Sequence, residues 1–163
     1  MMSSTASRSS DITRQVVVIS AVTFMIIAAL FGAGVLGGTP VQDLQGGALS
    51  ATATVLAPAS SAFSIWSVIY LFMIAYTVWQ ALPSQRGSDR QRKVGYPIAV
   101  TAVINGLWLL AAQYTTLPLT VLTIVVLLAA LGWTIRLLVL HPPRTFAETF
   151  FTDVTVGLHL GWV

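Results

Sequence analysis

The sequence contains no cysteine and very little charge. The absence of cysteine excludes a disulfide framework, a thiolate-bound zinc site, an iron–sulfur cluster and a cysteine nucleophile. Charged residues make up 8% of the 163 residues, whereas soluble domains carry about 25%. Because 56% of the residues are hydrophobic, the chain has too little charge to cover a soluble core. It is also too hydrophobic to be disordered. This composition predicts an integral membrane protein.

Four apolar runs are long enough to cross a bilayer, which takes about 20 helical residues. A fifth run, Phe150 to Val163, has 14 residues. At about 1.5 Å per residue it reaches roughly 21 Å, less than a hydrocarbon core of about 30 Å. We therefore predict an all-α membrane helix bundle with four complete transmembrane helices and a partial fifth. Residues 1–15 would form a tail before a single domain, 16–163, with spans at about 16–38, 62–82, 96–117 and 119–140, and the partial one at 146–163.

Proline and glycine give further expectations about these helices. Pro97 and Pro118 lie near the expected first turns of the third and fourth spans, where proline is tolerated because the first amide groups of a helix lack partners. Gly34 and Gly38 form a G-x-x-x-G pattern, which predicts that the first span approaches a neighbouring helix closely.

All lysine and arginine residues fall on one side of this topology. The loops at about 41–59 and 114–118 contain none. By the positive-inside rule, the N-terminus and the 83–95 loop are predicted to face the cytoplasm, in a bacterial cytoplasmic membrane. The basic cluster in the 83–95 loop is interpreted as a topology anchor, with binding of anionic membrane lipid as the alternative. Because the basic residues lie between apolar runs, we expect no nucleic-acid partner. They are Arg8, Arg14, Arg86, Arg90, Arg92, Lys93, Arg136 and Arg144.

Residues that carry catalytic or metal chemistry are sparse. The two histidines, His141 and His159, are 18 positions apart and have no carboxylate at ligand spacing. The first three spans have no ionisable residue in their interiors, and Asp153 and His159 occur only in the fifth run. The sequence therefore predicts neither an enzyme nor a metal site, and it argues against proton-coupled transport. The Thr39–Ala59 segment, with Asp43 as its only charge, is either a plain linker or a mobile cover.

The aromatic residues fall into two groups. Tyr96, Trp79 and Trp133 lie near the predicted cytoplasmic boundary and indicate an aromatic belt. Trp66 and Trp108, in contrast, lie one to two turns inside the outer ends of the second and third spans, and thus at similar depth.

Helical spacing brings these inner tryptophans onto shared faces. Phe63, Trp66 and Tyr70 share one face of the second span, and Asn105 and Trp108 share one face of the third. Hydrocarbon offers the Asn105 amide no partner, so it needs another helix, a trapped water or a ligand. If the fifth run is inserted, Trp162 also reaches the outer half. The set fits either an aromatic cavity for a planar apolar ligand or helix packing with one interhelical hydrogen bond.

These residues also carry a family resemblance. The stretch Pro-Ala-Ser-Ser-Ala-Phe-Ser-Ile-Trp-Ser-Val-Ile-Tyr at 58–70 resembles the second-helix signature of the TspO/MBR family, the tryptophan-rich sensory proteins related to the mitochondrial translocator protein. Asn-Gly-Leu-Trp at 105–108 resembles the Asn-x-x-Trp of its third helix, and the stretch 157–163 is similar to the start of its fifth.

The resemblance implies a five-helix bundle that binds porphyrin, haem-type or other hydrophobic small molecules without a covalent cofactor. It implies a sensory, regulatory or transport role, and a homodimer. Carried over by motif, the ligand-binding residues would be Phe63, Trp66, Tyr70, Asn105, Trp108 and Trp162.

Two features depart from the family pattern. The sequence ends at Val163 within the fifth helix, where longer members continue, and the stretch from Val41 to Ala57 contains no aromatic residue. Two other functions therefore stay open. The chain is also compatible with a structural or assembly subunit of a membrane complex that has no small-molecule site, and with part of a facilitative transporter.

Overall fold

The computed structural model describes residues 2–163 and contains helices and their connections, with no β-strand in that range. Four of the helices are long and apolar enough to cross a membrane. The α-helices are α1 Met2–Gly32, α2 Ile65–Ala81, α3 Pro83–Arg86, α4 Asp89–Tyr114, α5 Leu117–Leu140, α6 Phe146–Glu148 and α7 Val154–Trp162. Short 3₁₀ turns occur at η1 Val41–Asp43, η2 Gln45–Gly47 and η3 Ser60–Ser64, and a π-helical segment, η4 Thr149–Asp153, joins α6 to α7.

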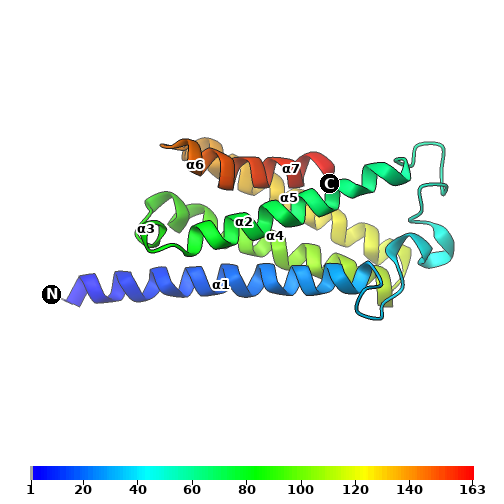
Figure 1. Ribbon diagram of the computed structural model, residues 1–163, viewed down its shortest axis with the longest axis horizontal. Coiled ribbons are helices and arrows are strands. Elements are labelled where there is room, and N and C mark those ends of the chain that lie inside the picture. Colours follow the sequence, from blue (N-terminus) through cyan, green and yellow to red (C-terminus); the bar gives the residue numbers. More distant parts are fainter. Residues whose placement is uncertain (1) are drawn as a thin grey trace.

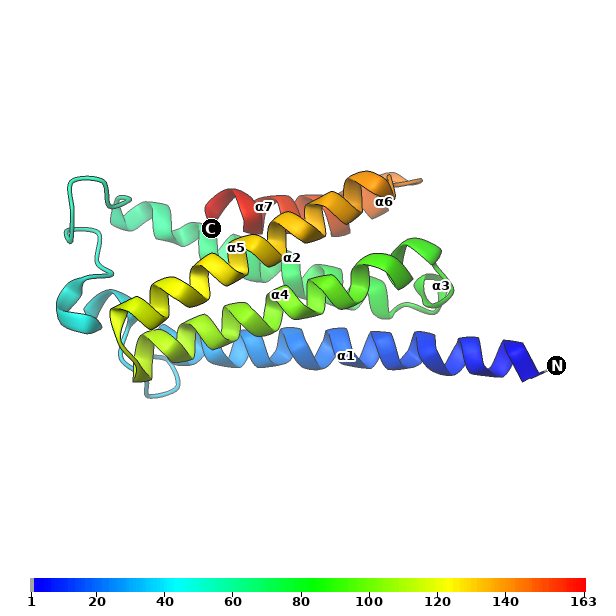
Figure 2. The same cartoon turned by 180° about the vertical axis from the view of Figure 1, so that it is seen from behind.

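The helices form a closed five-membered bundle (Figures 1 and 2). Helix α4 packs against both α1 and α5, α7 packs against α5 and α2, and α2 contacts α1. The fifth member is the shorter column of α6, η4 and α7. The predicted architecture, an all-α membrane bundle with four complete spans and a partial fifth, is therefore confirmed.

The two ends of this bundle differ in composition. One end carries the N-terminus, α3, the start of α4, the end of α5 and α6, and all eight lysine and arginine residues lie at or near it; we call it the charged end. The opposite end carries the connection between α1 and α2, residues 33–59, which we call the covering loop; we call that end the loop end.

The first helix begins well before the predicted span, so residues 2–15 are helical and do not form a separate tail. Polar side chains at the end of the predicted tail are buried against the bundle. The Arg14 guanidinium is 1% exposed and donates through Nη2 to the backbone carbonyls of Gln85 (3.3 Å) and Arg86 (3.0 Å). The Gln15 amide donates to the carbonyl of Gln80 at 2.7 Å. These bonds tie the early turns of α1 to α2 and α3, which a solvated tail would not allow.

The predicted 83–95 loop is likewise mostly helical. Helix α4 starts at Asp89, because the Ser88 hydroxyl accepts the Gln91 amide N–H at 3.3 Å and so caps the helix. Pro97 consequently lies inside α4 and not in its first turn. Membrane helices tolerate an internal proline because neighbouring groups can satisfy the freed backbone carbonyl. Pro118, in contrast, lies in the first turn of α5, where proline was predicted.

The predicted G-x-x-x-G contact on the first span is wrong. Helix α1 ends at Gly32, and Gly34 has a φ of +79°, outside the helical region. Close packing occurs on α4 instead, where a Cβ atom at Gly106 would lie 2.5 Å from the Phe24 ring of α1. Ala102 shares this face and is fully buried. Small residues on α4 therefore allow α1 and α4 to approach each other.

Candidate functional site

An aromatic cluster lies at the loop end of the bundle, with Trp66 of α2 at its centre. The Trp66 ring stacks on Tyr70 and on Trp108 of α4, with centroid distances of 5.6 and 5.7 Å and interplanar angles of 23° and 20°. Trp162 of α7 meets Trp66 edge-on at 6.5 Å and Phe63 at 5.8 Å. All the predicted site residues except Asn105 therefore belong to one continuous cluster.

The local sequence explains how α2 contributes three rings to this cluster. Phe63, Trp66 and Tyr70 follow i, i+3, i+7 spacing, and η3 leads into α2 without a break in direction, so the three side chains share one face. Trp108 reaches them from α4 and Trp162 from α7. Residues far apart in the sequence thus meet because the five helices close into a ring.

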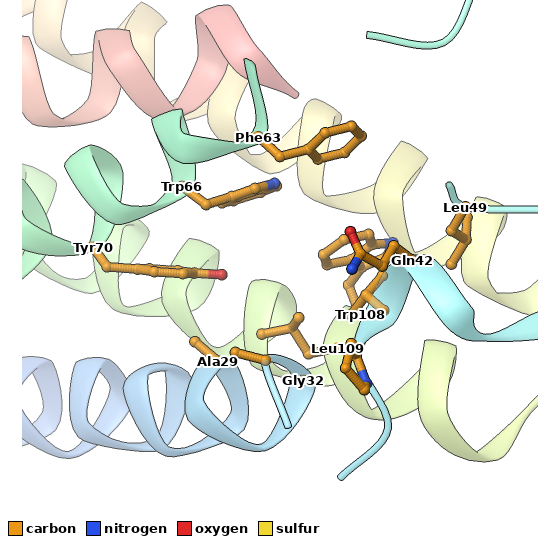
Figure 3. Close-up of a pocket in the computed structure, with 12 residues that line it drawn as sticks. Ala29, Gly32, Gln42, Leu49, Phe63, Trp66, Tyr70, Trp108 and Leu109 are labelled. Carbon is orange, nitrogen blue, oxygen red and sulfur yellow. The ribbon is translucent and has the colours of Figure 1, made fainter. Parts of the chain in front are cut away.

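A cavity of about 290 Å³ opens beside the stacked rings. Figure 3 shows Trp66 and Tyr70 of α2 on one side of it, with Trp108 of α4 and with Gln42 and Leu49 of the covering loop on the other. Helix α1 supplies the small residues of the remaining wall. The full lining is Ala29, Gly32, Ala33, Pro40, Val41, Gln42, Leu49, Phe63, Trp66, Tyr70, Trp108 and Leu109.

A second cavity of about 350 Å³ adjoins the first and shares the rings of Phe63, Trp66 and Trp108 with it. Its remaining wall comes from Ile124 of α5, from Trp162 and Val163, and from the covering loop, whose Val41 and Leu49 also line the first cavity. The shared rings therefore stand between two hollows, one toward α1 and one toward α5 and α7.

The covering loop is tied down over these cavities. The Gln113 amide of α4 accepts the Thr39 backbone N–H at 3.4 Å and donates back to the Thr39 carbonyl. The Gln45 amide donates to the Ala112 carbonyl at 3.2 Å and to the Thr120 hydroxyl at 3.0 Å. Because the loop is anchored to α4 and α5 and lines both cavities, it is a cover and not a plain linker.

Asn105 lies behind the cluster and lines neither cavity. Its amide nitrogen is 3.4 Å from Nε2 of His159 in α7, and both side chains are almost fully buried. The His159 ring meets Trp66 edge-on at 6.1 Å. The amide therefore pairs with another helix, which is one of the partners its burial requires. Asn105 Oδ1 and His159 Nδ1 have no hydrogen-bond partner among the described residues.

Two residues near the site escaped sequence reasoning. His159 precedes Trp162 by three positions, so helical spacing placed it on the same face of the fifth run and could have revealed it. Gln42 places a polar side chain at the cavity, but it lies on an irregular segment where no periodicity applies.

The charged end contains a different kind of interior. The Tyr76 hydroxyl donates to Gln91 Oε1 at 2.9 Å, and Gln91 Nε2 donates to the Thr152 hydroxyl at 3.3 Å. Trp79, predicted to belong to an aromatic belt, is 7% exposed and stacks on Phe151 at 5.6 Å. The belt prediction is wrong for Trp79, because its ring faces the short fifth column; Tyr96 and Trp133, the other two residues of the predicted belt, are exposed.

Comparison with known proteins assigns the family. None of the curated proteins and none of the solved structures matches this chain. A family model described as TSPO-like protein matches residues 15–163, which is nearly the whole chain and includes the cluster, both cavities and all five members of the bundle. The chain therefore belongs to the TSPO-like family and is an integral membrane protein of the TspO type.

Proposed function

We propose that this protein binds a porphyrin or another planar hydrophobic molecule in the aromatic cavities at the loop end. The observation that carries the proposal is the stack of Tyr70, Trp66 and Trp108 beside a cavity of about 290 Å³. Small-molecule sites are typically concave, mostly apolar and roughly 300–1,000 Å³ in volume. Stacked rings favour a flat, conjugated ligand, because the π-faces of two aromatic systems attract each other in offset geometry.

The polarity of the two linings supports the same class of ligand. None of the described residues that line them is charged. The first cavity offers polar side-chain groups at Gln42, at the Tyr70 hydroxyl and at the two indole nitrogens. An ion would lose its hydration here without compensation. A mostly apolar molecule with a few polar groups on its edge suits such a site.

The residue types in the two linings also indicate how a metalloporphyrin would be bound. They contain no histidine, cysteine or methionine among the described residues. The nearest imidazole, His159, lies against the Trp66 ring and lines neither cavity. We therefore propose that stacking and apolar contact are the main forces that hold the macrocycle, with Tyr70 as the side chain in these linings whose type can bind haem iron.

The proposal includes an orientation and a role. The charged end would face the cytoplasm by the positive-inside rule, which puts the cavities in the outer half of the membrane. Because the covering loop contacts the cavity and is bonded to α4 and α5, a bound ligand would act on the packing of that loop. This coupling favours a sensory or regulatory role.

Porphyrin titration of the purified protein in detergent tests the proposal. Protoporphyrin IX is expected to quench tryptophan fluorescence saturably. Trp66→Phe is expected to weaken binding about tenfold, equivalent to about 1.4 kcal/mol, because it shrinks the ring that contacts both cavities. The matched control is Trp133→Phe, since Trp133 is 57% exposed on α5 and lines neither cavity. It should leave the dissociation constant unchanged.

Two results would contradict the proposal. Quenching that never saturates would indicate nonspecific partitioning of porphyrin into the micelle. Equal dissociation constants for both variants and the parent protein would place the ligand away from Trp66. The first result would favour a structural or assembly subunit without a small-molecule site, and the second would require a binding site outside the aromatic cluster. Saturable porphyrin flux into liposomes that depends on Trp66 would instead add a transport role to the binding site.

A further inference from the structure

A third cavity, unrelated to the aromatic cluster, lies at the charged end of the bundle. Its volume is about 480 Å³. The start of α4, the end of α5 and the turn before α6 meet around it, and Figure 2 shows these three elements at the same end of the molecule. The lining is Gly87, Ser88, Asp89, Arg90, Lys93, Leu140, His141, Pro142, Pro143, Arg144 and Glu148.

The cavity is lined by three cationic side chains and two carboxylates. Asp89 forms an ion pair with Arg92 at 3.0 Å, and Glu148 accepts the backbone N–H of Arg144 at 2.7 Å and keeps its charge at the edge of the cavity. The side chains of Lys93 and Arg144 make no ion pair or hydrogen bond within the part of the chain that the structure describes. These two cations therefore remain available to an anion.

A third cation in the wall is almost completely buried. Arg90 is 7% exposed, donates through Nε to the His141 carbonyl at 2.6 Å and forms an ion pair with Asp153 through Nη2 at 2.5 Å. Its Nη1 has no hydrogen-bond partner among the described residues. The bonds to His141 and Asp153 hold Arg90 in the wall, and the field that an anion meets in the cavity comes mainly from Lys93 and Arg144. The positive end of the α4 dipole adds to the same field.

The position along α5 places this cavity at the membrane surface. Trp133 and Arg136 are exposed on α5, and the Arg136 guanidinium lies 5.8 Å from the centre of the Trp133 ring. Tryptophan and arginine in such an arrangement are typical of the interface between hydrocarbon and head groups. His141 lies five residues further along, roughly 8 Å at the helical rise, which is the depth of the phosphate groups.

We propose that this cavity binds a phosphate group, carried either by an anionic phospholipid or by a soluble phosphate compound. Lys93 and Arg144 supply the accessible charges. The buried Arg90 holds the lining in place through its bonds to His141 and Asp153. Phosphate oxygens suit guanidinium and ammonium donors of this kind. The site is separate from the aromatic cavities, since the linings share no residue.

Native mass spectrometry of the full chain in neutral detergent tests this proposal. The probes are short-chain phosphatidylglycerol and phosphatidylcholine of the same chain length. One phosphatidylglycerol is expected to bind each protein molecule, at least about tenfold more tightly than phosphatidylcholine. The double variant Lys93→Gln/Arg144→Gln should lose that tenfold preference. The control Arg8→Gln/Arg136→Gln removes the same charge from exposed arginines that do not line the cavity and should keep the preference.

Competition by inorganic phosphate separates the two sources. If millimolar phosphate displaces phosphatidylglycerol, the site takes soluble phosphate compounds; if it does not, the site takes the lipid, and either outcome supports a phosphate site. Circular dichroism and size-exclusion chromatography check that both double variants stay folded. Equal binding of the two lipids would overturn the proposal. So would equal losses in the two double variants, because the attraction would then come from overall charge and not from this cavity.

Discussion

The charged end and the loop end of the bundle are held together by different interactions. At the charged end, buried polar side chains bond one another and the backbone, as Arg14 does with α3 and Gln91 does with Tyr76 and Thr152. At the loop end, aromatic rings pack around two adjoining cavities, and the buried polar pair Asn105–His159 keeps unpartnered atoms.

The difference indicates a division of roles between the two ends. Directional bonds at the charged end fix the positions of the helices relative to one another, because each bond constrains both the distance and the angle between its groups. Ring stacking at the loop end tolerates small shifts and leaves space unfilled. The account therefore predicts that changes at the charged end reduce stability, whereas changes to the cavity-lining rings of the loop end mainly reduce ligand binding.

Arg14→Met is expected to cause the largest loss of unfolding free energy, because it removes interactions that hold the helices together at the charged end. It removes the buried guanidinium that donates to the part-buried carbonyls of Gln85 and Arg86 and to Oε1 of the buried Gln80. The loss in unfolding free energy should be about 3 kcal/mol, measured by denaturation in mixed micelles and followed by circular dichroism. Porphyrin affinity of the folded protein should stay within about twofold of the parent value.

Arg8→Met is the matched control for this prediction. Arg8 is exposed on the same helix, so its replacement should change the unfolding free energy by less than about 0.5 kcal/mol. Equal unfolding free energies for the two variants would show that the Arg14 contacts do not hold the early turns of α1, and the contrast between the ends would fail.

Asn105→Leu is expected to reduce the unfolding free energy less than Arg14→Met does. It tests whether Asn105, which lies next to the cavities, acts on stability or on ligand binding. It removes the only hydrogen-bond partner of the buried His159 ring within the described residues, and the expected loss of stability is about 1.5 kcal/mol. Because Asn105 lines neither cavity, porphyrin affinity should fall only about threefold, through the contact of His159 with Trp66. A loss of more than about tenfold would show that Asn105 touches the ligand.

The sequence was sufficient to predict the membrane bundle and most of the aromatic cluster. Long apolar runs gave the four spans, and i, i+3, i+7 spacing put Phe63, Trp66 and Tyr70 on one face. Both signals are local: the first depends on the length of an apolar run and the second on helical periodicity.

The features that escaped prediction depend on contacts between distant residues. Asn105 and His159 are 54 positions apart, and only the closed bundle brings them together. Arg14 belonged to the predicted tail, 1–15, but it is 1% exposed and lies within helix α1, which begins at Met2. A charged residue in a sequence is ordinarily predicted to be exposed to water. That prediction fails for Arg14, because its buried guanidinium donates to backbone carbonyls.

The most direct test of the central claim compares one tryptophan from each end. Trp108 stacks on Trp66 at the cavities, and Trp79 stacks on Phe151 at the charged end, with centroid distances of 5.7 and 5.6 Å. The dissociation constant of protoporphyrin IX is measured for Trp108→Leu and Trp79→Leu. The account predicts a rise of at least about tenfold for Trp108→Leu and of less than about twofold for Trp79→Leu. Equal rises, or a larger rise for Trp79→Leu, would contradict it.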